Sequence, residues 1–397
     1  MKKYVISFIG VVMAVLALWC NASPSFGQSN LGGARQNEWT RLAQVAESAA
    51  WKGALRSGEA QTNDDAPWTL PQDSGVFSAE LANRTLALSS ANTAEAQAQQ
   101  LESAGFTVRL QQNYDKADTS PEHTSAYTVA TQVITFAGAE RTLAIVVVRG
   151  TNGGEWYSNF DFAPSKSNQA VFAENFLFAA ENVFLGTKTV LDGISNPLIV
   201  ACGHSRGGAT ANLLGMLLNE QYGTENVYVY TSATPATFRG DGSALKTSNI
   251  FNLVNDGDVV PLVPLAAWGF VRLGTDVVLH AAEEDITRAA YVGQTLAGIS
   301  ADISSYYRDR HSLEHAGLSE DGITAFEMML CLANTMLEGE SAATTGAFDV
   351  FSEESDFAPL FAMISKAAEN NGTLAIQVLI QHLPMTYQTL LNQKENG

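Results

Sequence analysis

A serine lies within a Gly-x-Ser-x-Gly pattern at Gly203-His-Ser-Arg-Gly207. An apolar run at 198–201 precedes it, and small and aliphatic residues recur at helical spacing from 209 to 218. In a nucleophile elbow the serine occupies a sharp strand-to-helix turn, whose glycines are needed because a Cβ there would collide with neighbouring backbone. We therefore predict that Ser205 is a nucleophile at the start of a helix that ends before Gly223, rather than an incidental serine in a glycine-rich turn.

A serine hydroxyl needs a base, a group that orients the base, and donors for the oxyanion that forms. Two aspartates, Asp256 and Asp258, follow a predicted strand at 249–254. We predict Asp258 as the acid, because the Val-Val-Pro that follows it could bury and fix a carboxylate. Asp256 lies in an Asn-Asp-Gly sequence that is typical of a turn for backbone reasons alone.

The oxyanion donors are predicted at Thr151 and Arg206. Thr151 follows the apolar strand at 142–148 and offers both its N–H and its hydroxyl group. Arg206 starts the helix after the serine, and the positive end of that helix favours an anion. The alternative for 150–154, which is rich in glycine, is a flexible loop without this role.

Four segments together resemble the class 3 (fungal-type) lipases and their secreted bacterial relatives, over about Phe77 to Arg272. They are Val-Val-Arg-Gly-Thr151, Glu155-Trp-Tyr-Ser-Asn159, the serine motif and Val-Asn-Asp-Gly-Asp258-Val-Val-Pro. The resemblance implies an α/β-hydrolase fold, hydrolysis of carboxylic esters in lipids (EC 3.1.1), and a lid or mobile loop after Thr151. Arg206 departs from the leucine of many relatives, which leaves the shape of the acyl site open.

Several histidines follow the acid in the sequence. His280 comes very soon after Asp258, and His311 lies at an ordinary distance for the family. His382 matches the family's His-x4-Tyr pattern with Tyr387 and leads into a last helix. We therefore favour His382 as the base, with His311 as the alternative; a base at His382 requires the helices at about 280–375 to be an insertion or cap.

Strand and helix patterns alternate along the middle of the chain, which predicts an α/β fold with a parallel-rich central sheet covered by helices on both faces. Two helices are expected within 77–104 and another at 171–191. Beyond about Thr275 the chain is expected to be helical. The first strand is expected to begin at Gly105. Further strands are expected at 126–136, 142–148, 198–201, 227–231 and 249–254. The late helices are expected at 282–307, 324–337 and 357–368.

The N-terminus has the features of an export signal. Two lysines precede an apolar run from Tyr4 to Trp19, and a small residue, Ala22, offers a cleavage site. We expect residues 1–22 to be a signal peptide, 23–75 a poorly ordered leader, and 76–397 the hydrolase domain, in a protein that is secreted, periplasmic or at the cell surface. Lipoprotein attachment at Cys20 is a minor alternative.

The chain has 41 acidic against 22 basic residues and a formal net charge of −19, which argues against nucleic acid as a partner. Any contact with a lipid interface is expected to be transient and through apolar surface. Serine-based hydrolysis needs no metal, and the sequence has no Cys-x2-Cys pair, so neither a metal nor another cofactor is predicted. No structural disulfide is expected, and the oligomeric state is open.

We therefore predict a secreted serine hydrolase that cleaves lipid esters, as a triacylglycerol lipase or a phospholipase-like enzyme, through an acyl-enzyme on Ser205. The elbow serves many acyl transfers, so the alternatives are a non-lipid carboxylesterase or acyltransferase and a catalytically silent lipase-like binding protein.

Overall fold

The computed structural model describes residues 68–91, 93–114, 124–150, 171–240, 242, 244–262, 266, 270–287, 289–290 and 380–396. The predicted signal peptide at 1–22, with Cys20, lies outside this part of the chain. So do most of the predicted leader and of the late helical region.

A seven-stranded sheet forms the centre of the molecule, in the order β1-β2-β3-β5-β6-β8-β10. The strands are β1 (Thr107–Gln112), β2 (Tyr127–Phe136), β3 (Ala139–Val148), β5 (Leu198–His204), β6 (Val227–Ser232), β8 (Ile250–Asn255) and β10 (Thr275–Leu279). The first two pairings, β1 with β2 and β2 with β3, are antiparallel, and all later ones are parallel. The parallel strands β5 and β6 are buried along their whole length, as expected for strands covered on both faces.

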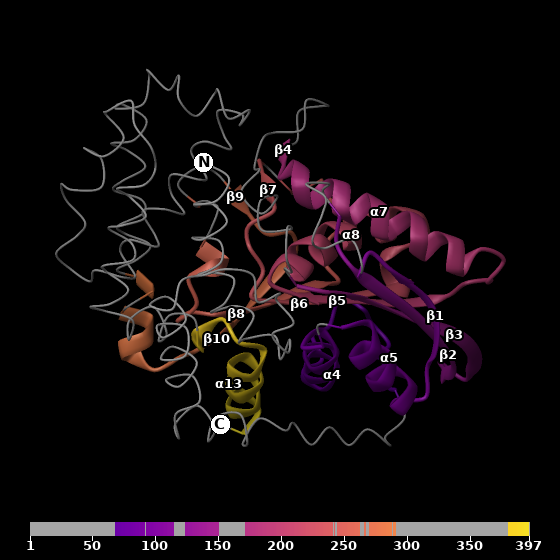
Figure 1. Ribbon diagram of the computed structural model, residues 1–397, viewed down its shortest axis with the longest axis horizontal. Helices are drawn as coiled ribbons and strands as arrows, with labels where there is room; N and C mark the ends of the chain where they lie inside the picture. Colours follow the sequence, from indigo (N-terminus) through magenta and orange to yellow (C-terminus); the bar gives the residue numbers. More distant parts are fainter. Residues whose placement is uncertain are drawn as a thin grey trace, which may run out of the picture.

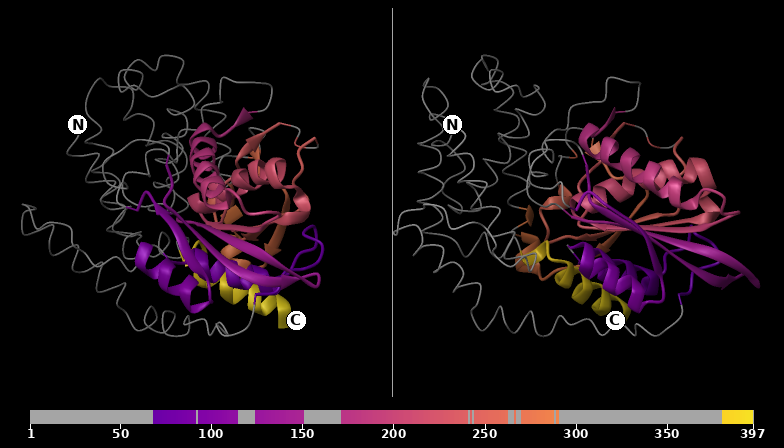
Figure 2. Two further views of the ribbon diagram at one scale, coloured as in Figure 1. Left: turned by 90° about the vertical axis from the view of Figure 1, so that its right-hand side faces the viewer. Right: turned by 45° about the vertical axis from the view of Figure 1, so that its right-hand side comes forward.

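Helices cover both faces of this sheet (Figures 1 and 2). On one face lie α7 (Glu174–Leu191) and α8 (Arg206–Tyr222), and on the other lie α4 (Ala79–Ser89), α5 (Ala94–Ser103) and α13 (Pro384–Asn396). Each face has its own apolar core. The C-terminal α13 packs against α4, so the end of the chain completes the same layer as its first described helices.

Local sequence accounts for several of the helix ends. The side chains of Ser78 and Thr93 accept hydrogen bonds from the first turns of α4 and α5, as N-cap residues do. The helix α8 ends at Gly223, which has a φ of 82°. The predicted helices and strands up to residue 255 are therefore confirmed to within a few residues.

Some elements differ from the prediction or were not predicted. Residues 275–279 form β10, an edge strand parallel to β8. The Val-Val-Leu run before His280 is typical of a strand, although the chain beyond about Thr275 was otherwise expected to be helical. A small antiparallel sheet of β4 (Val171–Phe172), β7 (Phe238–Arg239) and β9 (Phe270–Val271) was also missed. Two-residue strands have no detectable periodicity. The short 3-10 helices are η1 (Thr224–Asn226) and η2 (Val260–Leu262).

The packed domain reaches further towards the N-terminus than predicted. Trp68 and Leu70 are buried, and the Trp68 ring meets Phe106 edge-on with centroids 5.3 Å apart. The segment 68–75 is therefore part of the packed structure and not of the poorly ordered leader that the sequence predicts, because its aromatic and aliphatic side chains cover one end of the α4 and α5 face.

The architecture is that of an α/β-hydrolase: a mostly parallel sheet, helices on both faces, and a strand-to-helix turn at Ser205 between β5 and α8. No helix in the described ranges is long and apolar enough to cross a membrane.

Candidate active site

Ser205 occupies a strained turn between β5 and α8. Its backbone has a φ of 59° and a ψ of −125°, a region that residues with a Cβ rarely adopt. The Ser205 N–H donates to the carbonyl oxygen of Ser232 at 2.9 Å, which fastens the turn to the end of β6. The strain is therefore held by the sheet, and Ser205 stands at the carboxyl ends of the central strands.

The glycines around Ser205 are required by close backbone approaches. A Cβ on Gly203 would lie 2.2 Å from the carbonyl oxygen of Gly207, and a Cβ on Gly207 would lie 2.3 Å from the carbonyl oxygen of Val148. Both distances are far below van der Waals contact with atoms that cannot move aside. The Gly-x-Ser-x-Gly pattern thus has the steric origin that the sequence indicated.

We expect Gly207→Ala to lower the free energy of unfolding by about 3 kcal/mol or more, because the added methyl group must displace the β3 backbone. Gly138→Ala is the matched control. Gly138 has a φ of 80° and open space around it, so only the left-handed strain of about 1–2 kcal/mol applies. Urea unfolding of both variants measures the difference; equal losses would contradict the steric explanation.

The structure brings Ser205, His382 and Asp258 together. The Nε2 atom of His382 lies 2.9 Å from the Ser205 Oγ atom, and its Nδ1 atom lies 2.7 Å from the Asp258 Oδ2 atom. The side chains of His382 and Asp258 are 5% and 0% exposed. In the neutral tautomer whose Nδ1–H donates to Asp258, Nε2 is the atom that can accept the Ser205 proton.

Asp258 is fixed by two donors besides His382. Its Oδ1 atom accepts from the N–H of Val260 at 3.0 Å, and its Oδ2 atom accepts from the Tyr387 hydroxyl at 2.7 Å. Burial, followed by the Asp258 charge, raises the pKa of Tyr387 well above its usual value, so the phenol remains a donor. The sequence singles out Tyr387 only as the tyrosine of the His-x4-Tyr pattern. Its hydrogen bond to Asp258 depends on the fold.

The segment that carries His382 is anchored at the start of α13. Pro384 opens this helix, a position that suits proline because no N–H partner is needed there. Leu383 is buried, and its carbonyl oxygen accepts from the N–H of Tyr387 at 3.2 Å. His382 therefore precedes a fixed helix rather than lying within an irregular loop.

His204, inside the serine motif, packs against the imidazole ring of His382. Its ring centroid is 5.0 Å from that of His382, and its Nδ1 atom lies 3.0 Å from the Ser232 Oγ atom. Its buried Nε2 atom has no hydrogen-bond partner within the described part of the chain. Burial, followed by the nearness of His382, lowers the pKa of His204 well below 6.5. The His204 side chain is thus an uncharged ring that packs beside His382.

The depressed pKa of His204 predicts a loss of stability in mild acid. The unfolded chain protonates this imidazole near pH 6.5 and the folded chain does not, so stability falls as the pH drops below about 6.5. The slope from this one group is at most about 1.4 kcal/mol per pH unit. Urea unfolding at pH 7 and pH 5 should show a smaller pH effect in His204→Gln; equal effects would assign the dependence to other groups.

Of the two predicted oxyanion donors, one lies in the described structure. Arg206 begins α8 directly after Ser205, so its N–H lies at the positive end of the helix. Its buried side chain donates to the carbonyl oxygen of Thr124 at 3.1 Å and lies over the Phe176 ring. Thr151 lies outside the described residues, although Gly150 before it passes close to the His204 carbonyl oxygen.

The other candidates from the sequence lie apart from Ser205 or beyond the described ranges. Asp256 binds the end of β10: its Oδ2 atom is 2.8 Å from His280 Nδ1, and its Oδ1 atom accepts from the N–H of Ala281 at 2.8 Å. The His280 side chain is 77% exposed. His311 falls outside the described part of the chain. Cys202 is buried as a free thiol, and burial raises its pKa to about 12.

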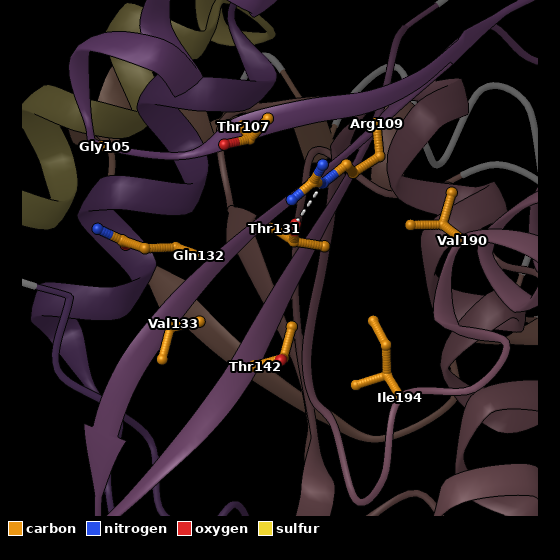
Figure 3. Close-up of a pocket in the computed structure, with 9 residues that line it drawn as sticks. All are labelled: Gly105, Thr107, Arg109, Thr131, Gln132, Val133, Thr142, Val190 and Ile194. Atoms are coloured by element: carbon orange, nitrogen blue, oxygen red, sulfur yellow. Dashed lines mark hydrogen bonds between the residues drawn. The ribbon is translucent and has the colours of Figure 1, made fainter.

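A cavity of about 450 Å³ lies elsewhere on the sheet (Figure 3). Arg109, whose Nε–H donates to the Thr131 hydroxyl oxygen at 2.8 Å, projects into it from β1. Val190, near the end of α7, and Ile194, in the loop after it, line the other side. Thr142, near the start of β3, also lines it, whereas Ser205 follows the carboxyl end of β5. This cavity is therefore not part of the candidate active site.

No group of three or more His, Cys, Asp or Glu side chains within the described ranges is arranged to hold a metal ion.

Part of this chain is similar to a known protein family. Residues 145–268 match the family described as lipase (class 3), a range that includes Ser205 and Asp258. None of the curated proteins that were compared matches the sequence. The Rhizomucor miehei triacylglyceride lipase is similar in structure, with 18% identity, a TM-score of 0.39, and coverage of 50% of this chain and 79% of that one.

Two further solved structures are similar at the same level. A lipase from Rhizopus microsporus var. chinensis has 18% identity and a TM-score of 0.38, covering 54% of this chain and 80% of that chain. A lipase from Yarrowia lipolytica has 18% identity and a TM-score of 0.38, covering 51% and 77%. Taken with the elbow at Ser205 and the α/β-hydrolase sheet, the match over residues 145–268 identifies this chain as a carboxylic ester hydrolase.

Proposed function

We propose that this protein hydrolyses carboxylic esters of lipids through a catalytic triad of Ser205, His382 and Asp258. The observation that carries the proposal is that one imidazole makes two hydrogen bonds, accepting from the Ser205 hydroxyl at 2.9 Å and donating to Asp258 at 2.7 Å. The lipid substrate rests on the match of residues 145–268 to the class 3 lipase family.

In the proposed reaction, His382 Nε2 takes the Ser205 proton as the Oγ atom attacks the ester carbonyl carbon. The oxyanion that forms accepts hydrogen bonds from the N–H groups of Thr151 and Arg206. Its collapse breaks the ester bond, and His382 gives its proton to the departing alcohol. Water then attacks the acyl-enzyme with the same proton transfers and releases the fatty acid.

Asp258 holds the imidazole in the tautomer that leaves Nε2 as an acceptor, and it stabilises the imidazolium in both steps. Tyr387 and the N–H of Val260 keep this carboxylate oriented, since each donates to one of its oxygens. The reaction requires no metal or cofactor in this scheme.

Hydrolysis of p-nitrophenyl butyrate and palmitate by the purified protein tests the proposal, with Ser205→Ala as the control for background. A lipase should turn over the long chain, and a non-lipid esterase only the short one. A fluorophosphonate probe should label Ser205 in either enzyme. Absence of both turnover and labelling would contradict the proposal and favour a silent binding protein.

We also propose that the chain is exported, because residues 1–22 have the charge and hydropathy pattern of a signal peptide. Expression of the full chain in a bacterial host, followed by intact-mass measurement of the exported protein, should find the N-terminal segment removed. An uncleaved protein retained in the cells would contradict export.

A further inference from the structure

The histidine and the acid of the proposed triad come from segments 124 positions apart in the chain. The side chain of Asn255, at the end of β8, connects these two segments. Its Nδ2 group donates to the main-chain oxygen of Gln381 at 2.8 Å and to the Gln381 Oε1 atom at 3.0 Å. Its Oδ1 atom accepts from the N–H of Gly257 at 2.9 Å. One buried carboxamide thus binds both the acid turn and the residue before His382.

These bonds bear directly on the geometry of the triad. The Gln381 oxygen belongs to the peptide group that joins Gln381 to His382, so fixing it fixes the start of the His382 backbone. On the other side, the Asp258 N–H donates to the main-chain oxygen of Asn255 at 3.0 Å. Asn255 therefore sets the separation of the two residues whose side chains must meet at 2.7 Å.

From these contacts we infer that Asn255, with Gln381 as its partner, is a positioning residue that holds His382 in register with Asp258 and Ser205. The inference rests on the proposed function. An asparagine suits this position because its carboxamide has two N–H donors and an acceptor; aspartate lacks the donors when ionised, and an aliphatic residue lacks both.

The experiment compares Asn255→Ala with Asn249→Ala in the full-length protein. Asn249 lies just before β8, is equally buried, and bonds to Asn219 and the Val227 carbonyl oxygen, at the other end of the strand. Both variants should lose stability. We expect only Asn255→Ala to lower kcat, by about 10- to 100-fold with little change in KM, since a displacement of about 1 Å can cost about 100-fold.

Gln381→Ala removes the side-chain acceptor but keeps the main-chain oxygen, so its loss of kcat should be smaller. The double variant with Asn255→Ala should be no slower than Asn255→Ala alone, because both changes act on one contact. If the loss of kcat in the double variant equals the product of the two single losses, the residues act independently, and this result would overturn their pairing.

A second readout does not depend on turnover. The Nδ1–H of His382, bonded to a carboxylate, should give a strongly deshielded proton resonance in the wild type and in Ser205→Ala. Asn255→Ala should lose or broaden this resonance under conditions where the protein remains folded, and Asn249→Ala should keep it.

An unchanged resonance and kcat in Asn255→Ala, or an equal loss of both in Asn249→Ala, would overturn the inference. If the wild type shows no ester hydrolysis that is lost in Ser205→Ala, the proposed function is refuted instead. The proton resonance would still decide whether Asn255 positions His382.

Discussion

Ser205→Ala and His382→Ala will each lower kcat for ester hydrolysis by about a millionfold, and the double variant will be no slower than either single one. The reason is geometric: the two side chains meet at 2.9 Å and act as one unit, so removing either leaves the other without a role. A residual rate above that in water should remain, from substrate binding and the oxyanion donors. Single-turnover measurements with p-nitrophenyl butyrate test this.

The controls for this prediction are His280→Ala and His311→Ala. His280 pairs with Asp256 at the end of β10, and its side chain is largely exposed. We expect both variants to keep turnover near that of the wild type. An inactive His311→Ala variant together with an active His382→Ala variant would identify His311 as the base and contradict the proposed triad.

Asp258→Asn should lower kcat by about 10⁴-fold, the next largest effect. An asparagine that keeps its bond with the Val260 N–H through Oδ1 would place its amide group where the Asp258 Oδ2 atom lies, facing Nδ1 of His382. This donor forces the imidazole into the tautomer that has its proton on Nε2, where it can no longer accept the Ser205 proton. The loss should therefore be in kcat, with KM little changed.

Asp256→Asn is the matched control for the acid. It lies two positions away in the same turn and also pairs with a histidine, but it faces the end of β10. The variant keeps an acceptor for the Ala281 N–H, so kcat should change by only a few-fold. A loss as large as that of Asp258→Asn would show that the whole turn, and not the Asp258 carboxylate, carries the effect.

These predictions concern residues from both faces of the sheet. The serine turn leads into α8 on one face, whereas His382 and Tyr387 belong to the segment that ends in α13 on the other (Figure 1). Asp258 follows β8 between them. The C-terminal layer is therefore required to complete the candidate site as well as to cover the sheet.

Sequence alone predicted the parts of this protein that depend on local chemistry. The serine turn is specified by glycines within a few residues of Ser205. A Cβ on these glycines would collide with neighbouring backbone. The buried parallel strands follow from short apolar runs such as 198–201, and the layering of helices follows from their alternation with those strands. Asp258 could be preferred to Asp256 because its neighbours in sequence differ.

The tertiary structure decided the contacts between distant segments. The sequence left His382 and His311 open, and the fold places His382 beside Ser205, 177 positions away. The bonds of Tyr387 to Asp258 and of Asn255 to Gln381 have no local signal either, nor do the two-residue strands β4 and β7. Periodicity reports which face of one element is buried, whereas the pairing of remote segments is set by how their packed surfaces fit together.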